Sequence, residues 1–487
     1  PELHSRLVHG DQIFFPTELL HGLYDGGHGA NLYDYWEAAR RSPVNAGGFL
    51  WNLRDEALWR DDTQSYDSDG NHAPDGIVGP HGEKEGSFYT VREVWAPVQI
   101  NPFVIHDRFD GGIVVRNEFI YTNLQECRFE WRLEKKATPY HTDNQTLAAG
   151  TIDGPDIDPG LSGKINIPLP PDFMDGDILV LKATDPHNRE IYTWRWPVQR
   201  PENYIPKVLS TAPYPQQDIH TEASGGELTV KVGNLIYRFD LEDGTLKNIQ
   251  NGQKDISFSG GPVPVGYKPT PNQPGEVHWG QNEDGSVVIR GTFDHYPKTF
   301  DWVVRRNGLL ELRIDALMHN QDSIDFLGIS FNYPEEMMHG VRWMGDGPYR
   351  VYKNRMEGVT FDVWEKEYNN TVTGESYESL IYPEFKGYHA NLYWAEFETA
   401  ESNFKVFCST PNVFLKIYTP EAPAAPGSGA HTVYPEGDIS FLHYISAIGT
   451  KFQSLGRLGP SAMPNRHSWR TGDVFEPIRL VFDFHNP

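Results

Sequence analysis

The chain has 487 residues, of which 38% are hydrophobic and 13% aromatic, so it carries enough apolar material for packed cores and is not a disordered chain. Its 67 acidic residues outnumber 42 basic ones and leave a formal charge of −25, which excludes a broad basic surface for nucleic acid. No apolar run reaches the roughly 18 residues of a membrane span. The two cysteines, Cys127 and Cys408, form no CxxC pair and indicate neither a zinc motif nor a disulfide framework.

Residues 1–97 alternate short apolar runs with a helical pattern. The runs 12–18 and 46–51 predict two buried strands, and the first of them ends in a carboxylate. Between them, apolar residues at helical spacing predict a helix over 32–41, with Asn31 as its cap. A last helical turn follows the second strand. This order of strand, helix, strand and helix is typical of βα units.

The remainder of the chain changes to strand periodicity. Residues 98–200 hold short alternating runs with turn signals, for example 128–133, and predict an immunoglobulin-like sandwich. Four prolines mark 201–221 as a linker. Residues 222–487 continue as strands with almost no helical pattern and predict one large β-sandwich. The expected fold class is therefore mainly β with an α/β segment at its start.

Glu18 is the first candidate for chemistry. A carboxylate at the carboxyl end of a buried strand lies where a (β/α)₈ barrel places catalytic groups, although a glutamate after a strand is more often a solvated loop residue. His21 follows three residues later, and Trp51 and Asn52 end the next apolar run. Aromatic faces stack on the apolar face of a pyranose while polar groups bind its hydroxyls, so this combination predicts a sugar site.

Several motifs in the same order resemble glycoside hydrolase family 2. The segment from Phe15 to Gly22 looks like the nucleophile segment of that family, and the run from Tyr35 to Trp51 is similar to its passage into the eighth barrel strand. Residues 91–98 resemble the segment that closes the barrel. Downstream, 98–200 look like the family's Ig-like domain, and 222–487 look like the terminal "small chain" sandwich of long β-galactosidases. The resemblance implies that 1–97 are the last two βα units of a (β/α)₈ barrel.

The resemblance also implies roles for single residues. Glu18 matches the catalytic nucleophile, His21 a substrate contact, and Trp51 the wall of the galactose pocket; Asn52 beside it is a further substrate-binding candidate. Asp75 falls where the family often has an asparagine that helps bind Na⁺, and this substitution puts the sodium site in doubt. Mg²⁺ is implied too, with most of its ligands outside this chain.

A retaining glycosidase needs a second carboxyl about 5–5.5 Å from the nucleophile. In the family, this acid/base glutamate comes from the fourth barrel strand, and no such segment precedes Glu18. A barrel takes roughly 200–250 residues, so residues 1–97 can supply only part of one. We therefore expect an N-terminal portion of the same enzyme, as a separate chain or cleaved fragment, and a homo-oligomer.

The expected function is a retaining exo-glycoside hydrolase that removes terminal β-galactosides from oligo- or polysaccharides by double displacement. A β-glucuronidase or β-mannosidase type of the same family is the first alternative, against which the large terminal sandwich argues. A non-catalytic carbohydrate-binding or structural β-protein is the second, against which the joint presence of Glu18, His21 and Trp51 argues. Analogy with polysaccharide degraders favours a bacterial periplasm or secretion and leaves the cytoplasm open.

Overall fold

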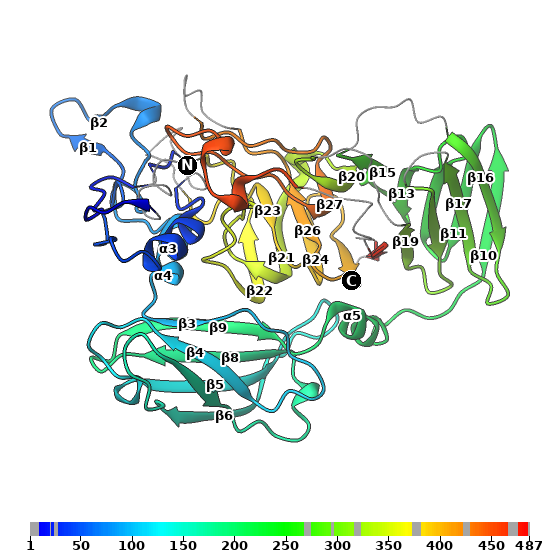
Figure 1. Cartoon of the computed structure of the whole chain (residues 1–487). Helices are drawn as coiled ribbons and strands as arrows, with labels where there is room; N and C mark the ends of the chain where they lie inside the picture. The colour runs from blue at the N-terminus through cyan, green and yellow to red at the C-terminus, as the bar shows by residue number, and fades with distance from the viewer. Residues whose placement is uncertain are drawn as a thin grey trace.

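The computed structural model describes residues 9–19, 21–23, 28–266, 274–293, 297–315, 323–372, 381–421, 429–465 and 476–485. Within these ranges the chain forms five β-sheets and three α-helices, so the prediction of a mainly β protein is confirmed (Figure 1). No helix in these ranges is long and apolar enough to cross a membrane.

Two large antiparallel sheets form the terminal part of the chain and share one hydrophobic core. The first sheet has the order β10 (Ile219–Ser224), β11 (Glu227–Val232), β12 (Leu235–Asp240), β13 (Leu246–Asn251), β15 (Ser259–Val265), β20 (Leu327–Asn332), β27 (Ile439–Tyr444), β26 (Phe414–Ile417), β23 (Gly387–His389), with β14 (Lys254–Ile256) beside β13. The second has the order β16 (Pro274–Gln281), β17 (Val287–Phe293), β18 (Thr299–Val304), β19 (Leu310–Ile314), β28 (Ile478–Asp483), β25 (Phe404–Cys408), β24 (Trp394–Thr399), β21 (Met338–Gly347), β22 (Thr360–Glu367). Three 3₁₀ turns accompany them, η4 (Glu335–Met337), η5 (Leu455–Arg457) and η6 (Pro460–Ala462).

The alternation that predicted these strands is also what builds the core. In β12 the side chains of Leu235, Tyr237 and Phe239 are buried, while the residues between them are less so. Trp302 of β18 packs against Phe239 from the opposite sheet, with ring centroids 5.9 Å apart. The two sheets therefore bury their inward faces against each other.

Two smaller sheets precede this pair and enclose a second core. One is β3 (Val98–Ile100), β4 (Gly112–Asn117), β7 (Ser162–Asn166), and the other is β6 (Gln145–Asp153), β5 (Arg128–Lys135), β8 (Ile178–Thr184), β9 (Glu190–Pro197), with η2 (Leu124–Glu126) and η3 (Phe173–Asp175) in the connections. The expected strand at 128–133 is the centre of β5. That these sheets are immunoglobulin-like stays a prediction, as do the domain boundaries.

The first part of the chain combines helices with parallel backbone pairing. It contains α3 (Leu32–Arg40), β1 (Ala57–Arg60), β2 (Ser65–Ser68), η1 (Gly70–His72) and α4 (Gly86–Val94). The helix predicted over 32–41 is confirmed as α3. Phe14 pairs with Asn45 and Leu19 with Leu50 in parallel bridges, which agrees with βα order. A barrel stays a prediction.

The runs 12–18 and 46–51 are not the buried strands that their apolar residues predicted. Each is held only by isolated bridges, and Ile13, Phe15 and Phe49 are 80%, 47% and 59% exposed. Their apolar faces lack a cover among the described residues, and burial needs a neighbouring element as well as apolar side chains.

Asn31 precedes α3 but does not cap it, contrary to prediction. Its backbone is left-handed with φ at 61°, and its side chain makes no bond to the first turn's amides. Its amide nitrogen donates instead to Asp34 Oδ2 at 2.9 Å and to Ser461 Oγ at 2.7 Å. Tertiary contact with the terminal sheets therefore replaces local capping.

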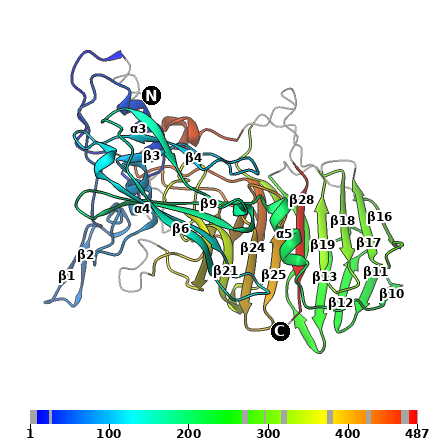
Figure 2. The same ribbon diagram turned by 90° about the horizontal axis from the view of Figure 1, so that it is seen from below.

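The segment 201–221, predicted as a linker, begins with helix α5 (Pro201–Leu209). Proline at the first helical position is favourable, because its fixed φ suits a helix and its absent N–H is not needed there. Tyr204, Ile205 and Val208 are buried in a cluster shared with β25. Figure 2 shows α5 lying beside β25 and β28, so this segment is in part a packed element.

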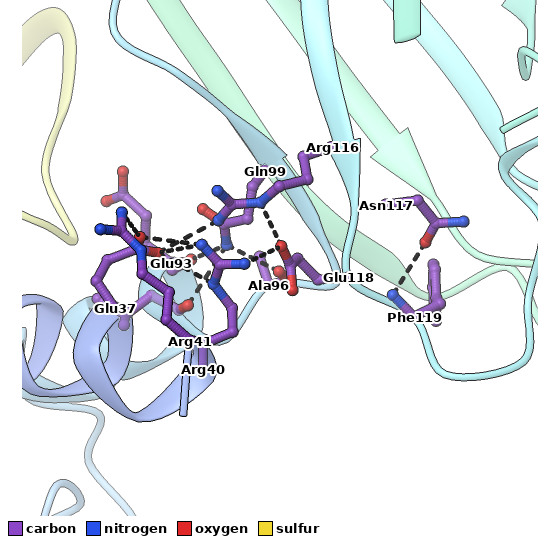
Figure 3. Close-up of polar contacts among 11 residues, drawn as sticks. Glu37, Arg40, Arg41, Glu93, Ala96, Gln99, Arg116, Asn117, Glu118 and Phe119 are labelled. Atoms are coloured by element: carbon purple, nitrogen blue, oxygen red, sulfur yellow. Dashed lines mark hydrogen bonds and ion pairs between the residues drawn. The ribbon is translucent and has the colours of Figure 1, made fainter. Parts of the chain in front are cut away.

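Ion pairs join α3 to the smaller sheets (Figure 3). Glu37 lies 3.0 Å from Arg40 and 3.3 Å from Arg116 of β4, and Arg40 lies 3.3 Å from Glu118. Burial acts to raise the pKa of Glu37, but the neighbouring arginines outweigh it and lower that pKa. The network holds α3 against the end of β4.

Candidate functional site

Glu18 is positioned by the pairing of the two irregular segments. Leu19 N donates to Phe49 O at 2.8 Å, and Trp51 N donates to Leu19 O at 3.1 Å. These bonds place Leu19, the residue after Glu18, beside Leu50 and Trp51. The Glu18 side chain is 52% exposed, so its carboxylate can be reached from solvent.

His21 orients the Glu18 carboxylate. Its Nε2 lies 3.0 Å from Glu18 Oε2. The imidazole ring stacks against Trp51 with centroids 6.1 Å apart, and the edge of Phe452 meets it at 4.9 Å. A carboxylate and three rings therefore lie together at an exposed surface, the arrangement that a pyranose with one apolar face can use.

Asp75 forms the buried base of the site. Its Oδ1 accepts a bond from Asn52 Nδ2 at 3.1 Å, and its backbone O accepts one from Asn52 N at 2.9 Å. Asn52 was predicted to bind substrate, and the structure shows its amide nitrogen engaged with Asp75. The peptide bond between Trp51 and Asn52 is cis.

The charge of Asp75 is matched by a lysine from the terminal sheets. Lys451 Nζ lies 2.9 Å from Asp75 Oδ2 and donates to His72 O at 2.7 Å. Burial raises the pKa of Asp75, and the bond and charge of Lys451 act against that rise. The structure thus brings all five predicted site residues into one cluster.

Lys451 and Phe452 are the site residues that sequence reasoning missed. Phe452 contacts His21, and Lys451 N donates to His21 O at 2.9 Å. Lys451 and Asp75 are 376 positions apart, so no local pattern could have joined them. Only the packing of the terminal segment against residues 9–97 reveals them.

A second buried carboxyl, Asp55, lies behind Asp75. It accepts a bond from Gly76 N at 2.8 Å. Burial, followed by the nearby charge of Asp75, raises the pKa of Asp55 to about 7. Asp55 is enclosed and does not face solvent, so its place is one of support for the loop that carries Asp75.

The sodium site suggested by Asp75 does not fit this arrangement. Na⁺ binds through oxygen ligands, and both Asp75 carboxylate oxygens are already engaged, Oδ1 by the Asn52 amide at 3.1 Å and Oδ2 by the Lys451 ammonium at 2.9 Å, a like charge that would repel the ion. Across the described ranges, the structure contains no group of three or more His, Cys, Asp or Glu side chains able to hold a metal ion.

Comparison with known proteins defines the class of the terminal sheets. Residues 231–422 match the family described as beta galactosidase small chain. The chain is 30% identical over 122 residues to a beta-galactosidase of Priestia megaterium (strain DSM 319 / IMG 1521) and 28% identical over 109 residues to one of Actinobacillus pleuropneumoniae. The first match covers 23% of this chain and 12% of the relative, and the second 21% and 10%. The chain thus spans about a tenth of the length of these relatives.

These matches confirm the recognition of a long β-galactosidase-type protein. The family match lies within the range that the sequence assigned to the terminal sandwich, so the chain carries a β-galactosidase small-chain region.

Two solved structures are similar at a much lower level. A putative mutarotase from Salmonella typhimurium has 12% identity and a TM-score of 0.29 over 57% of this chain and 98% of that one. The exo-chitosanase CsxA of Amycolatopsis orientalis has 10% identity and a TM-score of 0.19 over 58% of this chain and 33% of that one. At such scores the likeness defines no shared fold.

Proposed function

We propose that this chain is part of a retaining glycoside hydrolase that removes terminal β-galactosides and that Glu18 is its nucleophile. The observation that carries the proposal is the contact of Glu18 with His21, whose ring stacks against Trp51, in a chain with a β-galactosidase small-chain region. An exposed carboxylate beside an aromatic face is what attack on a bound sugar ring requires.

In the proposed mechanism, a Glu18 oxygen attacks the anomeric carbon and the bond to the leaving oxygen breaks. An acid/base carboxyl gives its proton to that oxygen. Water then attacks the same carbon, its proton passes to the acid/base carboxylate, and the bond to Glu18 breaks. His21 keeps the Glu18 carboxylate oriented through the 3.0 Å contact, and Trp51 presents its face to the ring.

The acid/base carboxyl is proposed to come from an N-terminal portion of the same enzyme. Ile13, Phe15, Phe49 and Leu53 are exposed apolar side chains around the parallel bridges of residues 9–54. We assign this surface to packing against the remaining barrel units, because several exposed apolar side chains close together are typical of a surface that another part of the protein covers. Mg²⁺ ligands are assigned to that portion as well.

The test is Glu18→Gln in the completed enzyme, meaning this chain together with the proposed N-terminal portion, assayed on an aryl β-galactoside. The amide cannot attack the anomeric carbon, so we expect turnover to fall at least about 10³-fold while circular dichroism and melting temperature are unchanged. Glu222→Gln on the exposed edge strand β10 is the matched control and should keep full activity. Near-normal turnover by Glu18→Gln would remove Glu18 from the mechanism.

The β-glucuronidase and β-mannosidase types stay as alternatives within the same chemistry. Parallel assays with aryl β-glucuronide and β-mannoside decide among them. Binding of galactosides without hydrolysis by the completed enzyme would favour the non-catalytic alternative.

A further inference from the structure

A segment that follows β27 enters the Glu18 site. Lys451 N donates to His21 O at 2.9 Å, and the Phe452 ring lies against the His21 ring. Thr450 N donates to Gln453 O at 2.9 Å, which closes the turn that carries both residues. The two side chains are thus delivered to the site by a hydrogen-bonded turn.

The Lys451 ammonium sits at the buried end of this segment. It donates to His72 O at 2.7 Å and lies 2.9 Å from Asp75 Oδ2, and only 13% of the side chain is exposed. The Asp75 side chain is fully buried. A buried carboxylate is stable only with a compensating charge or bonds, and here Lys451 supplies the charge.

The same carboxylate holds the residue next to Trp51. Asp75 Oδ1 accepts the Asn52 amide at 3.1 Å while Oδ2 faces Lys451. The cation therefore fixes Asp75, and Asp75 fixes Asn52 at the aromatic wall. An ammonium carries three N–H donors, and the described residues supply acceptors for two of them.

We infer that Lys451 is a built-in cation that takes the place of a metal ion at Asp75, and that it positions Asp75 and Asn52 for a sugar hydroxyl. The role in positioning a sugar hydroxyl rests on the proposed function, whereas the replacement of a metal ion by Lys451 does not. A Na⁺ ion at Asp75 would be repelled by the Lys451 ammonium, and both carboxylate oxygens already accept bonds from Asn52 and Lys451. The site is therefore independent of sodium.

The first test needs no catalysis. The full chain is melted in NaCl and in choline chloride at equal ionic strength, and ²³Na line widths are recorded on the same samples. We expect equal melting temperatures and no saturable broadening in the wild type. A sodium-specific rise in melting temperature that Asp75→Asn removes would overturn the inference.

Variants of the lysine separate charge from packing. Lys451→Met keeps the length of the side chain and removes its charge, so we expect a loss of at least ~2 °C in melting temperature in choline chloride. Part of that loss should return in NaCl. Lys451→Arg keeps the charge and should stay insensitive to sodium. Lys247→Met is the control, because it removes a surface ion pair of similar distance, with Lys247 Nζ 2.8 Å from Asp240 Oδ2. We expect it to change the melting temperature by less than ~1 °C. Lys451→Met that melts like the wild type in both salts would contradict the inference.

A kinetic measurement tests the positioning role in the completed enzyme. We expect the galactosidase kcat/KM to be equal in NaCl and choline chloride, and Lys451→Met to raise KM about tenfold or more. Wild-type activity that requires sodium would contradict the inference. A complete lack of galactosidase activity would instead reject the proposed function, and the melting and ²³Na results would still decide the cation's identity.

Discussion

Asp483 connects three parts of the chain: β28, the segment after β5 and the segment after α5. Loss of its charge should destabilise the contacts among all three. It ends β28 and is fully buried. Tyr140 and Tyr214 each donate a hydroxyl bond to its Oδ2 at 2.9 Å, and Lys405 Nζ lies 3.5 Å away. Tyr140 follows β5 in the smaller sheets, and Tyr214 follows α5. The change to make is therefore Asp483→Asn, which keeps the shape and removes the charge.

The expected cost follows from these contacts. A hydrogen bond to a charged group contributes about 1.5–3 kcal/mol, and breaking a buried ion pair costs about 3–5 kcal/mol. Because asparagine keeps one acceptor oxygen, we expect about 3–5 kcal/mol for Asp483→Asn. In a chain of several units a single unfolding free energy is not defined, so the melting temperature is the measured quantity, with an expected fall of at least ~5 °C.

Differential scanning calorimetry at pH 7 gives the comparison. Asp301→Asn is the control, since Asp301 pairs with Arg290 at 2.6 Å but the arginine is largely exposed, and we expect at most about 1 kcal/mol. Burial acts to raise the pKa of Asp483, yet the His485 bond and the charge of Lys405 lower it. The stabilisation by ionised Asp483 is therefore present above about pH 4 and is lost as the pH falls through the lowered pKa of Asp483 in the folded chain. Asp483→Asn that melts within 1 °C of the wild type would refute the reasoning.

Three further results are expected. Ile205→Ala should cost about 2–5 kcal/mol, seen as a lower urea midpoint, because this α5 side chain is fully buried in the cluster shared with β25; an unchanged midpoint would mean that α5 does not pack there. Burial raises the pKa of Cys127 to about 11 and of Cys408 to about 12, so neither should react with a disulfide reagent before unfolding, and rapid labelling of the native chain would contradict this. Burial raises the pKa of Asp55 to about 7, so ionising this carboxyl destabilises the folded chain, and the loss of stability increases as the pH rises from about 4 to 7. Asp55→Asn should therefore raise the melting temperature at pH 8 and not at pH 4. Equal shifts at both pH values would contradict this prediction.

Local patterns predicted the elements that depend on local physics. The helical spacing around Trp36 predicted α3 within one residue, and the alternation over 128–133 predicted β5. In these segments one face is buried by neighbouring elements of the same chain, so the side-chain period and the burial pattern coincide.

Non-local packing explains what the sequence did not predict. The prolines in 201–221 predict a linker, yet Pro201 starts a helix whose buried face packs against β25. Glu18, His21, Trp51 and Asn52 were predicted from the ends of two apolar runs, and Asp75 was predicted from the resemblance to glycoside hydrolase family 2. Lys451 enters the site from the far end of the chain, and the sequence near it carries no mark of that contact.

The most direct measurement is covalent trapping of the nucleophile. The completed enzyme is incubated with a 2-deoxy-2-fluoro-β-galactosyl inactivator, digested, and mapped by mass spectrometry. One fluorosugar on the peptide that contains Glu18, absent after Glu18→Gln, is the predicted result. A fluorosugar on any other carboxylate, or inactivation without label on this chain, would contradict the assignment of Glu18 as the nucleophile.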